Sequence, residues 1–458
     1  MVSFSSLEFL FRFLPVFLIL YFAVPAKYRE TILLVGSLVF YAVGEPVFIL
    51  VLIVTTLVNY SIGMQSWKLG EGFSLHEWQK NKRRRYMMQA IALDAAVLVI
   101  FKCLAVFVDN TLLPLGISFY IFKMISFQVD MFRGEVWSKP KFQNVATYFT
   151  MFPQVVSGPI MRYHEGEFDL ERTYSFEKFE DGLKVFVAGL GMKVLLADRL
   201  AILWNDLQMI GFQSISTPLA WLGAFAYSLR LYFDFWGYSL MASGLMVMLG
   251  FDFIENFHHP YASRSISEFY RRWHMTLGSW FRDYVYIPLG GSRCRPNRVI
   301  LNLAVVWILT GIWHGNGVNY VIWGVVLGLL IILEKVLYGK FLGKIPVLGN
   351  IYVLAVIPLT WVVFAITDLK QLGIYFGRLF PFLGGAGLAV NQQDIIKYLQ
   401  DYSVYFIAGI LLCIPAVSRF FEKHKKNPIV VLLCVILFWT SIYYLSSSAG
   451  NPFMYLNF

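Results

Sequence analysis

The chain has 458 residues, of which 58% are hydrophobic and only 14% carry a charged side chain. Soluble domains contain about 45–50% apolar and about 25% charged residues, so this composition excludes a soluble enzyme and predicts a polytopic membrane protein. The net charge of +10 comes largely from basic clusters at 80–85, 291–298 and 419–426, a pattern typical of cytoplasmic loops. We therefore expect contact with membrane lipids and no nucleic-acid partner.

Apolar segments recur along the whole chain, and a helix needs roughly 20 apolar residues to cross a bilayer. Some segments are short or contain proline, such as Pro114 and Pro153, and are candidates for re-entrant elements buried in protein. We expect an all-α polytopic protein with about eleven transmembrane helices plus re-entrant and interfacial helices, forming a single integral-membrane domain, residues 1–458. The segments are 7–24, 31–44, 46–64, 88–108, 111–130, 143–160, 183–200, 217–250, 299–313, 318–338, 347–367, 402–418 and 428–446.

No pattern typical of a metal site or of a soluble enzyme is found. The four cysteines are far apart and form no CxxC pair, so neither a disulfide framework nor a zinc site is predicted. His76, His164 and His424 lie in charged segments and are expected to be solvated. Asp234 lies in an apolar stretch with Arg230 four residues earlier, and an ion pair within one helix explains it.

The segment SISEFYRRWHMTLGSWFRDYVYIPLGG, residues 265–291, has the pattern of an amphipathic helix in the membrane interface. Ser265 and Glu268 form the S-x-x-E pattern of a capping box, which marks a helix start. Aromatic and aliphatic residues, with His274 among them, then recur every three or four positions, as they do on one face of a helix. On these residues alone His274 is equally well a core or a functional histidine. The basic residues off the apolar stripe are Arg271, Arg272 and Arg282.

A second histidine lies in GIWHGNGVNYVIWG, residues 311–324, between two apolar segments. The Gly-Asn-Gly break after His314 predicts that a helix ends there, which places the imidazole at a helix terminus. Gly311 and Gly315 are expected to leave room for a ligand. Burial favours a neutral imidazole that can accept a proton, and the alternative is a histidine that only joins two helices by hydrogen bonding.

Together these segments resemble the membrane-bound O-acyltransferase superfamily, in particular its bacterial alginate O-acetyltransferase type. The W-H-G segment preceded by the R-R-W-H segment is the most specific part of the resemblance. The resemblance implies a ring of membrane helices around a central tunnel, in the bacterial plasma membrane. The matching blocks are PLGISFYIF (114–122), FPQVVSGPIMR (152–162), YFDFWGYSLMASG (232–244), the two histidine segments and the closing NPFMYLNF.

The resemblance also implies roles for the two histidines. His314 matches the catalytic histidine of the family and is the expected base, and His274 matches a second motif position that orients the thioester or stabilises charge. The expected donor is acetyl-CoA, with no bound cofactor and no metal. Arginines attract the phosphates of coenzyme A. Anchoring of the chain at the cytoplasmic face of the membrane by positive charge explains these arginines equally well. The residues expected to bind substrate or donor are Trp273, Trp313, Asn316, Arg271, Arg272 and Arg282.

The tail FMYLNF, 453–458, has the F-x-Y-x-x-F pattern that related acyl-export systems present near the outer face. If the basic cluster at 419–426 is cytoplasmic, the span at 428–446 crosses outward and this tail ends outside. Tyr455 is then a candidate acyl relay, and the alternative is an interfacial aromatic anchor. The expected partner is an extracytoplasmic transferase of the SGNH-hydrolase type.

The predicted function is transfer of an acetyl group from a cytoplasmic thioester across the membrane, for O-acetylation of an exported polysaccharide or peptidoglycan. The near alternative is D-alanyl transfer to teichoic acid from a carrier protein. The alternative from another class is a transporter or flippase. Transporters often contain inverted repeats, and no such symmetry is found here.

Overall fold

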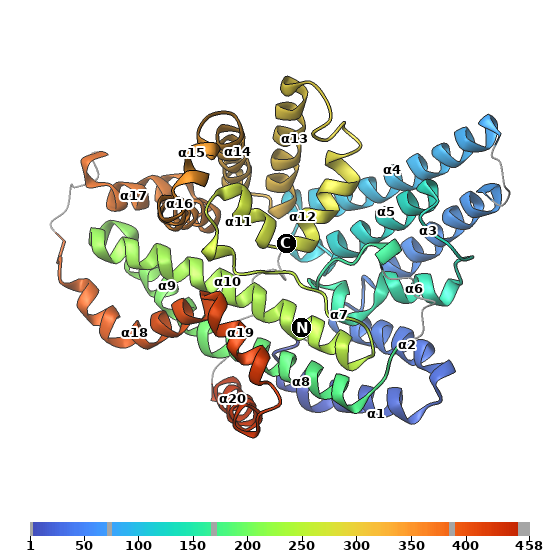
Figure 1. The fold of residues 1–458 in the computed structure, drawn as a ribbon, viewed down its shortest axis with the longest axis horizontal. Helices are drawn as coiled ribbons and strands as arrows, with labels where there is room; N and C mark the ends of the chain where they lie inside the picture. Colours follow the sequence, from blue (N-terminus) through green and yellow to red (C-terminus); the bar gives the residue numbers. More distant parts are fainter. Residues whose placement is uncertain (1–2, 71–75, 166–171, 384–389, 448–458) are drawn as a thin grey trace. The chain divides into compact units, whose positions relative to one another are not determined.

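The computed structural model describes residues 3–70, 76–165, 172–383 and 390–447. These residues form helices and connections, with no strand among them (Figure 1), so the all-α prediction is confirmed. They fall into two compact units. Unit 1 contains the residues up to 186 together with 241–254, and unit 2 contains 187–240 and the described residues from 255 onward. The expected single domain over 1–458 stays a prediction.

Unit 1 contains both long helices and short ones. In chain order its elements are η1 (Phe9–Phe13), α1 (Leu14–Ala23), α2 (Ala26–Gly44), α3 (Ile49–Gly70), α4 (Glu77–Phe107), η2 (Asn110–Leu112), α5 (Ile117–Arg133), α6 (Phe142–Thr150), α7 (Phe152–Val155), η3 (Tyr163–Glu165) and α8 (Phe176–Gly191), whose last residues belong to unit 2. Figure 1 shows α3, α4 and α5 side by side. The segment 143–160 forms the short helices α6 and α7 instead of one span.

The basic cluster at 80–85 lies on a helix, because α4 begins at Glu77, and its prediction as a loop was wrong. The guanidinium of Arg83 donates to the carbonyl oxygen of Met131 at the end of α5. The basic first turns of α4 and the C-terminal end of α5 are therefore neighbours. The positive-inside rule predicts that this end of unit 1 faces the cytoplasm, and this orientation stays a prediction.

The start of α5 joins two of the sequence blocks quoted above. Gly116 of PLGISFYIF precedes the helix with φ of 68°, in the left-handed region that glycine adopts without a steric penalty. A Cβ atom at this position would lie 2.0 Å from the carbonyl oxygen of Val155 in FPQVVSGPIMR. The two blocks therefore pack backbone to backbone inside unit 1.

Unit 2 contains the elements that follow. They are η4 (Met192–Ala197), α9 (Asp198–Ile210), η5 (Phe212–Ser214), α10 (Thr217–Met248, its last turns in unit 1), η6 (Pro260–Ala262), α11 (Ile266–Arg272), α12 (Met275–Phe281), η7 (Arg282–Tyr286), α13 (Pro296–His314), α14 (Val318–Leu333), η8 (Glu334–Tyr338), α15 (Gly339–Lys344), α16 (Pro346–Ala365), α17 (Leu369–Leu379), η9 (Pro381–Leu383), α18 (Asp394–Cys413), α19 (Pro415–His424) and α20 (Pro428–Ser447). The stretch 217–250 thus forms one long helix, α10, and the basic cluster at 419–426 lies mainly on α19.

In the described part of the chain, 8 helical segments are long and apolar enough to cross a membrane. They confirm a multi-pass membrane protein. The expected number of crossings and the ring around a tunnel stay predictions. The segments are Ile49–Gly70, Glu77–Phe107, Asn110–Arg133, Pro296–His314, Val318–Lys344, Pro346–Ala365, Asp394–Cys413 and Pro428–Ser447.

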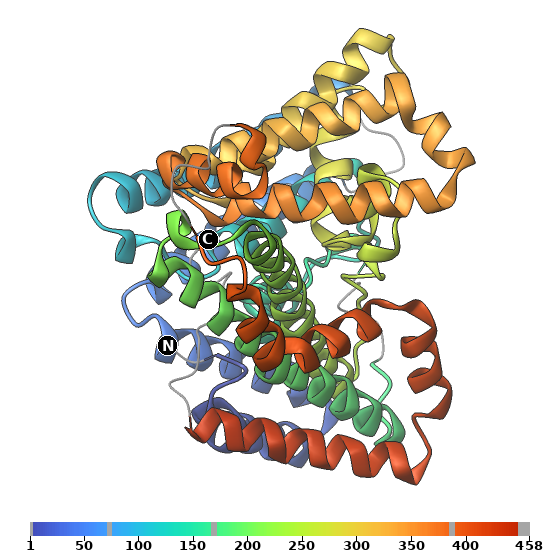
Figure 2. The same ribbon diagram turned by 90° about the vertical axis from the view of Figure 1, so that its left-hand side faces the viewer.

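Helices α13 and α14 pack tightly against each other (Figure 2). A Cβ atom at Gly311 would lie 2.6 Å from the carbonyl oxygen of Tyr320, and one at Gly324 would lie 2.5 Å from that of Trp307. Small residues permit such close approach of membrane helices. The prediction that Gly311 and Gly315 leave room for a ligand was wrong, because a Cβ at Gly315 would lie 2.3 Å from the ring of Tyr320.

Candidate active site

His314 is the last residue of α13, as predicted, and the chain leaves the helix at Gly315 in an extended conformation. Its side chain is buried among aromatic rings. The ring centroids of Trp313, Trp323 and Phe364 lie 4.6, 5.0 and 5.3 Å from that of the imidazole. The imidazole therefore lies in a largely aromatic environment.

His274 lies at a break between two helices. Helix α11 ends at Arg272 and α12 begins at Met275, and His274 between them has φ of 48°, which is uncommon for a residue other than glycine. The prediction of one continuous helix was therefore wrong. The predicted start is confirmed, since the Ser265 hydroxyl accepts a hydrogen bond of 3.0 Å from the backbone N–H of Glu268.

The side chain of His274 is held by Asn256. The amide oxygen of Asn256 accepts from the backbone N–H of Thr276 at 3.3 Å, and its amide nitrogen donates to the Ser239 hydroxyl at 2.9 Å. The Nδ1 atom of His274 lies 3.1 Å from the same amide oxygen, so Nδ1 must carry the proton and donate. The Nε2 atom is then a lone-pair acceptor, and it has no hydrogen-bond partner among the described residues.

Burial also determines the charge of this imidazole. His274 is 3% exposed, and burial lowers its pKa from 6.5 to about 3. The ring edge also meets the ring of Phe235, with centroids 4.7 Å apart. His274 is therefore neutral at physiological pH, with an unused acceptor on Nε2.

Aromatic rings connect the surroundings of the two histidines. Trp323 contacts His314, and its ring centroid lies 5.8 Å from that of Trp361. The ring centroid of Trp361 lies 4.9 Å from that of Trp273, the residue before His274. We call Trp273, Trp323 and Trp361 the tryptophan cluster; all three are buried. Unit 2 therefore places the His314 ring against this cluster, and the residue that precedes His274 is one of its members.

A buried carboxylate anchors the start of α11. The side chain of Glu334 in η8 is 5% exposed, and it accepts hydrogen bonds from the backbone N–H groups of Ile266 and Ser267 at 2.5 and 2.9 Å. A negative group at a helix N-terminus is stabilising. Sequence reasoning missed this positioning residue, although an acidic residue at the end of the apolar segment 318–338 was a signal.

The arginines expected to bind the donor differ in their surroundings. Arg272 pairs with Glu268 at 2.6 Å, and Arg282 pairs with Asp283 at 2.7 Å. Arg271 is exposed and forms no ion pair with any residue that the structure describes.

The other predicted site residues also differ in exposure. Trp273 and Trp313 are buried, and Asn316 is exposed in the connection between α13 and α14. Tyr455 lies outside the described residues.

Two further expectations change with the structure. Asp234 pairs with Lys193 at 3.0 Å, while Arg230 donates to the side chain of Asn205. His164 is not a solvated loop residue, because its Nδ1 lies 3.0 Å from the buried carboxylate of Asp130. Both contacts join segments too far apart in sequence for local patterns to reveal.

Comparison with known proteins places these features in context. The sequence model of the membrane-bound O-acyltransferase family matches residues 33–341. The chain is 34% identical to a probable alginate O-acetylase of Pseudomonas putida, over 99% of this chain and all of that protein. It is 27% identical to a peptidoglycan O-acetyltransferase of Helicobacter pylori over 99% of this chain and 97% of that protein. A teichoic acid D-alanyltransferase of Bacillus subtilis is 29% identical over 47% of this chain and 57% of that protein.

Proposed function

Since the chain belongs to the membrane-bound O-acyltransferase family, we propose that it moves an acetyl group from cytoplasmic acetyl-CoA across the bacterial plasma membrane for O-acetylation of an exported polysaccharide or peptidoglycan. Membership of this family makes the chain an O-acyltransferase and a membrane enzyme, and not a transporter or flippase. The observation that carries the proposal is the buried imidazole of His314 at the end of α13, in a chain with these relatives.

In the proposed reaction His314 is the general base. Acyl transfer from a thioester to a hydroxyl needs a base within about 2.6–3.2 Å of the nucleophile. Aromatic rings surround His314, and they favour the neutral imidazole that can take the proton of the attacking hydroxyl. The thioester bond then breaks, the new ester forms, and the proton on the imidazole is passed to the leaving thiolate.

The geometry of His274 supports the first of its two predicted roles. A group that stabilises a developing oxyanion must donate a hydrogen bond or carry positive charge. His274 is neutral, and its Nδ1 proton is directed to Asn256. We therefore assign its Nε2 atom to accept a hydrogen bond from an N–H or O–H group of the substrate. This hydrogen bond orients the substrate beside the tryptophan cluster.

Arg271 is the strongest candidate for the phosphates of coenzyme A, because Arg272 and Arg282 already pair with neighbouring carboxylates. Trp273, Trp313 and Asn316 are proposed to line the acyl path. Tyr455 is proposed to receive the acetyl group on the outer side and to pass it to a partner transferase of the SGNH-hydrolase type. Tyr455→Phe is then expected to retain thioester use while losing transfer to the polymer.

The acetyl group is preferred over D-alanine because relatives named as O-acetylating enzymes align over nearly the whole chain. The teichoic acid D-alanyltransferase aligns over 47% of it. The test is transfer in membranes that contain the full chain, with labelled acetyl-CoA or a D-alanyl carrier protein as donor. We expect label from acetyl-CoA alone, with His314→Ala as the inactive control. Label from the carrier protein alone would replace this proposal with D-alanyl transfer.

A further inference from the structure

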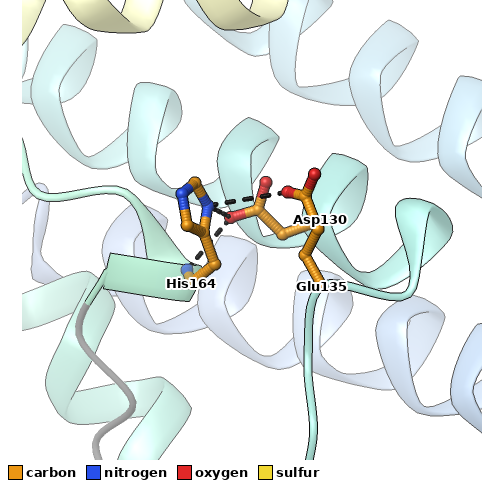
Figure 3. Close-up of side chains that lie close together, drawn as sticks. All are labelled: Asp130, Glu135 and His164. Carbon is orange, nitrogen blue, oxygen red and sulfur yellow. Dashed lines mark hydrogen bonds and ion pairs between the residues drawn. The ribbon is translucent and has the colours of Figure 1, made fainter.

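Three side chains of types that can bind metal ions converge at the C-terminal end of α5 in unit 1 (Figure 3). They are Asp130 in the last turn of α5, Glu135 just after that helix, and His164 in η3. One oxygen or nitrogen atom from each lies within 4.8 Å of the others. The cysteine and histidine patterns of the sequence predicted no metal site, and none of these residues belongs to the proposed acyl-transfer site.

The local fold explains why these side chains meet. Helix α5 ends at Arg133. Gly134 follows it with φ of 76° and turns the chain back, so that the backbone N–H of Glu135 donates to the carbonyl oxygen of Asp130 at 3.0 Å. The residues after FPQVVSGPIM then bring His164 to the same place, where its own backbone N–H donates to Asp130 Oδ2 at 3.1 Å. Two separate segments therefore present ligands to one point.

The two distances from the His164 imidazole to the carboxylates suit a tetrahedral ion. Zinc lies about 2.0–2.1 Å from its nitrogen and oxygen ligands, so ligand atoms in a tetrahedral site are about 3.3 Å apart. The Nδ1 atom of His164 lies 3.0 Å from Asp130 Oδ2 and 3.6 Å from Glu135 Oε2. These two distances bracket the tetrahedral value.

The ion pair between His164 and Asp130 leaves the Glu135 carboxylate without a hydrogen bond to one of its oxygen atoms. The imidazole has one Nδ1 proton, and the carboxylate of Asp130 is the nearer acceptor. Glu135 Oε2 is shielded from solvent and has no hydrogen-bond partner among the described residues. The nearby positive charge of Arg162 is directed to Glu165.

We propose that Asp130, Glu135 and His164 bind one divalent transition-metal ion, best matched by Zn²⁺. Imidazole nitrogen and carboxylate oxygen are both zinc ligands, and a site with three protein ligands leaves the fourth position for water. The backbone hydrogen bond to Asp130 Oδ2 orients that ligand, as outer contacts do in metal sites. The ion holds the segment after FPQVVSGPI against the end of α5, and this inference does not depend on the proposed acyl transfer.

The test is Zn²⁺ titration of the purified full chain in detergent after treatment with a chelator, followed by calorimetry and by elemental analysis of bound zinc. We expect one Zn²⁺ per chain in the wild type. Glu135→Gln and His164→Ala should each weaken binding by at least about tenfold. His258→Ala is the matched control, because His258 forms an exposed pair with Glu255 at 2.7 Å and should leave Zn²⁺ binding unchanged.

A second measurement separates loss of a ligand from loss of folding. Binding to the folded state alone raises its stability, so Zn²⁺ should raise the Tm of the wild type and of His258→Ala. The Tm of Glu135→Gln, a nearly isosteric change, should match the metal-free wild type and should not respond to Zn²⁺. Absence of stoichiometric Zn²⁺ binding by the folded wild type, or binding by Glu135→Gln that equals it, would overturn the proposal.

Discussion

At the residue scale, the proton on His274 decides what this side chain can do. Asn256 offers an acceptor to Nδ1, and burial lowers the pKa of the imidazole to about 3. The ring is therefore neutral throughout the range from pH 5 to 8 in which an unperturbed histidine titrates. Its Nε2 atom is therefore able to accept a hydrogen bond at every physiological pH.

Replacement of the Asn256 amide by a carboxylate tests whether Nε2 of His274 acts as a hydrogen-bond acceptor. In Asn256→Asp the new negative charge raises the pKa of His274, because an opposite charge favours the protonated ring. As pH falls, Nε2 then takes up a proton and stops accepting. We expect the acid limb of the rate profile to move to higher pH, while the rate at high pH stays close to that of the wild type. The measurement is acyl transfer between pH 5 and 8.

Asn427→Asp is the matched control for this profile, because the Asn427 side chain accepts from the backbone N–H of Ile429 at an exposed helix start, a role that aspartate also fills. Its profile should follow that of the wild type. An Asn256→Asp profile that is also unchanged would mean that Nε2 of His274 takes no part in the reaction.

Residue patterns predicted some of the site and missed the rest for a physical reason. The Gly-Asn-Gly break correctly predicted that α13 ends at His314. The partner of His274 lies 18 residues away along the chain, and that of His164 lies 34 residues away. Such pairs arise from tertiary folding, so no local pattern identifies Asn256 or Asp130 as a partner.

At the element scale, the close packing of α13 and α14 positions His314. The glycines between them carry no side chain that would separate the helices, and Trp323 on α14 contacts the imidazole. Long apolar runs predicted both helices well. The break at His274 was not predicted, because neither glycine nor proline occurs at Trp273 or His274 to mark it.

Gly311→Ala tests the packing of these helices. The added methyl group would lie 2.6 Å from the carbonyl oxygen of Tyr320, so the helices must separate, at a cost of about 1–3 kcal/mol. We expect a lower Tm in detergent and reduced acyl transfer. Gly373→Ala on α17 has nothing within 4 Å of the new methyl group and should keep or raise the Tm, since alanine favours helix. Equal Tm values for wild type and Gly311→Ala would contradict the tight packing.

At the scale of the whole molecule, the hydropathy of the sequence predicts where most of the long helices lie. Each apolar segment of the sequence corresponds to one or more helices, and 8 helical segments of the described part meet the length and hydropathy of a membrane span. Composition alone does not distinguish a span from a re-entrant helix, but Pro153 marked its segment as a candidate for a re-entrant element, and this segment forms two short helices. Family membership, in contrast, was predicted from ordered sequence blocks and is confirmed.

The central claim is that His314 is the base of a membrane acyl transfer. The most direct measurement is the rate of acetyl transfer from acetyl-CoA by the purified full chain, wild type against His314→Gln, with folding checked by chromatography. General-base catalysis contributes about 10²–10⁴-fold, so kcat should fall by roughly that factor while KM for acetyl-CoA stays nearly unchanged. A folded His314→Gln that retains most of the wild-type kcat would contradict the account.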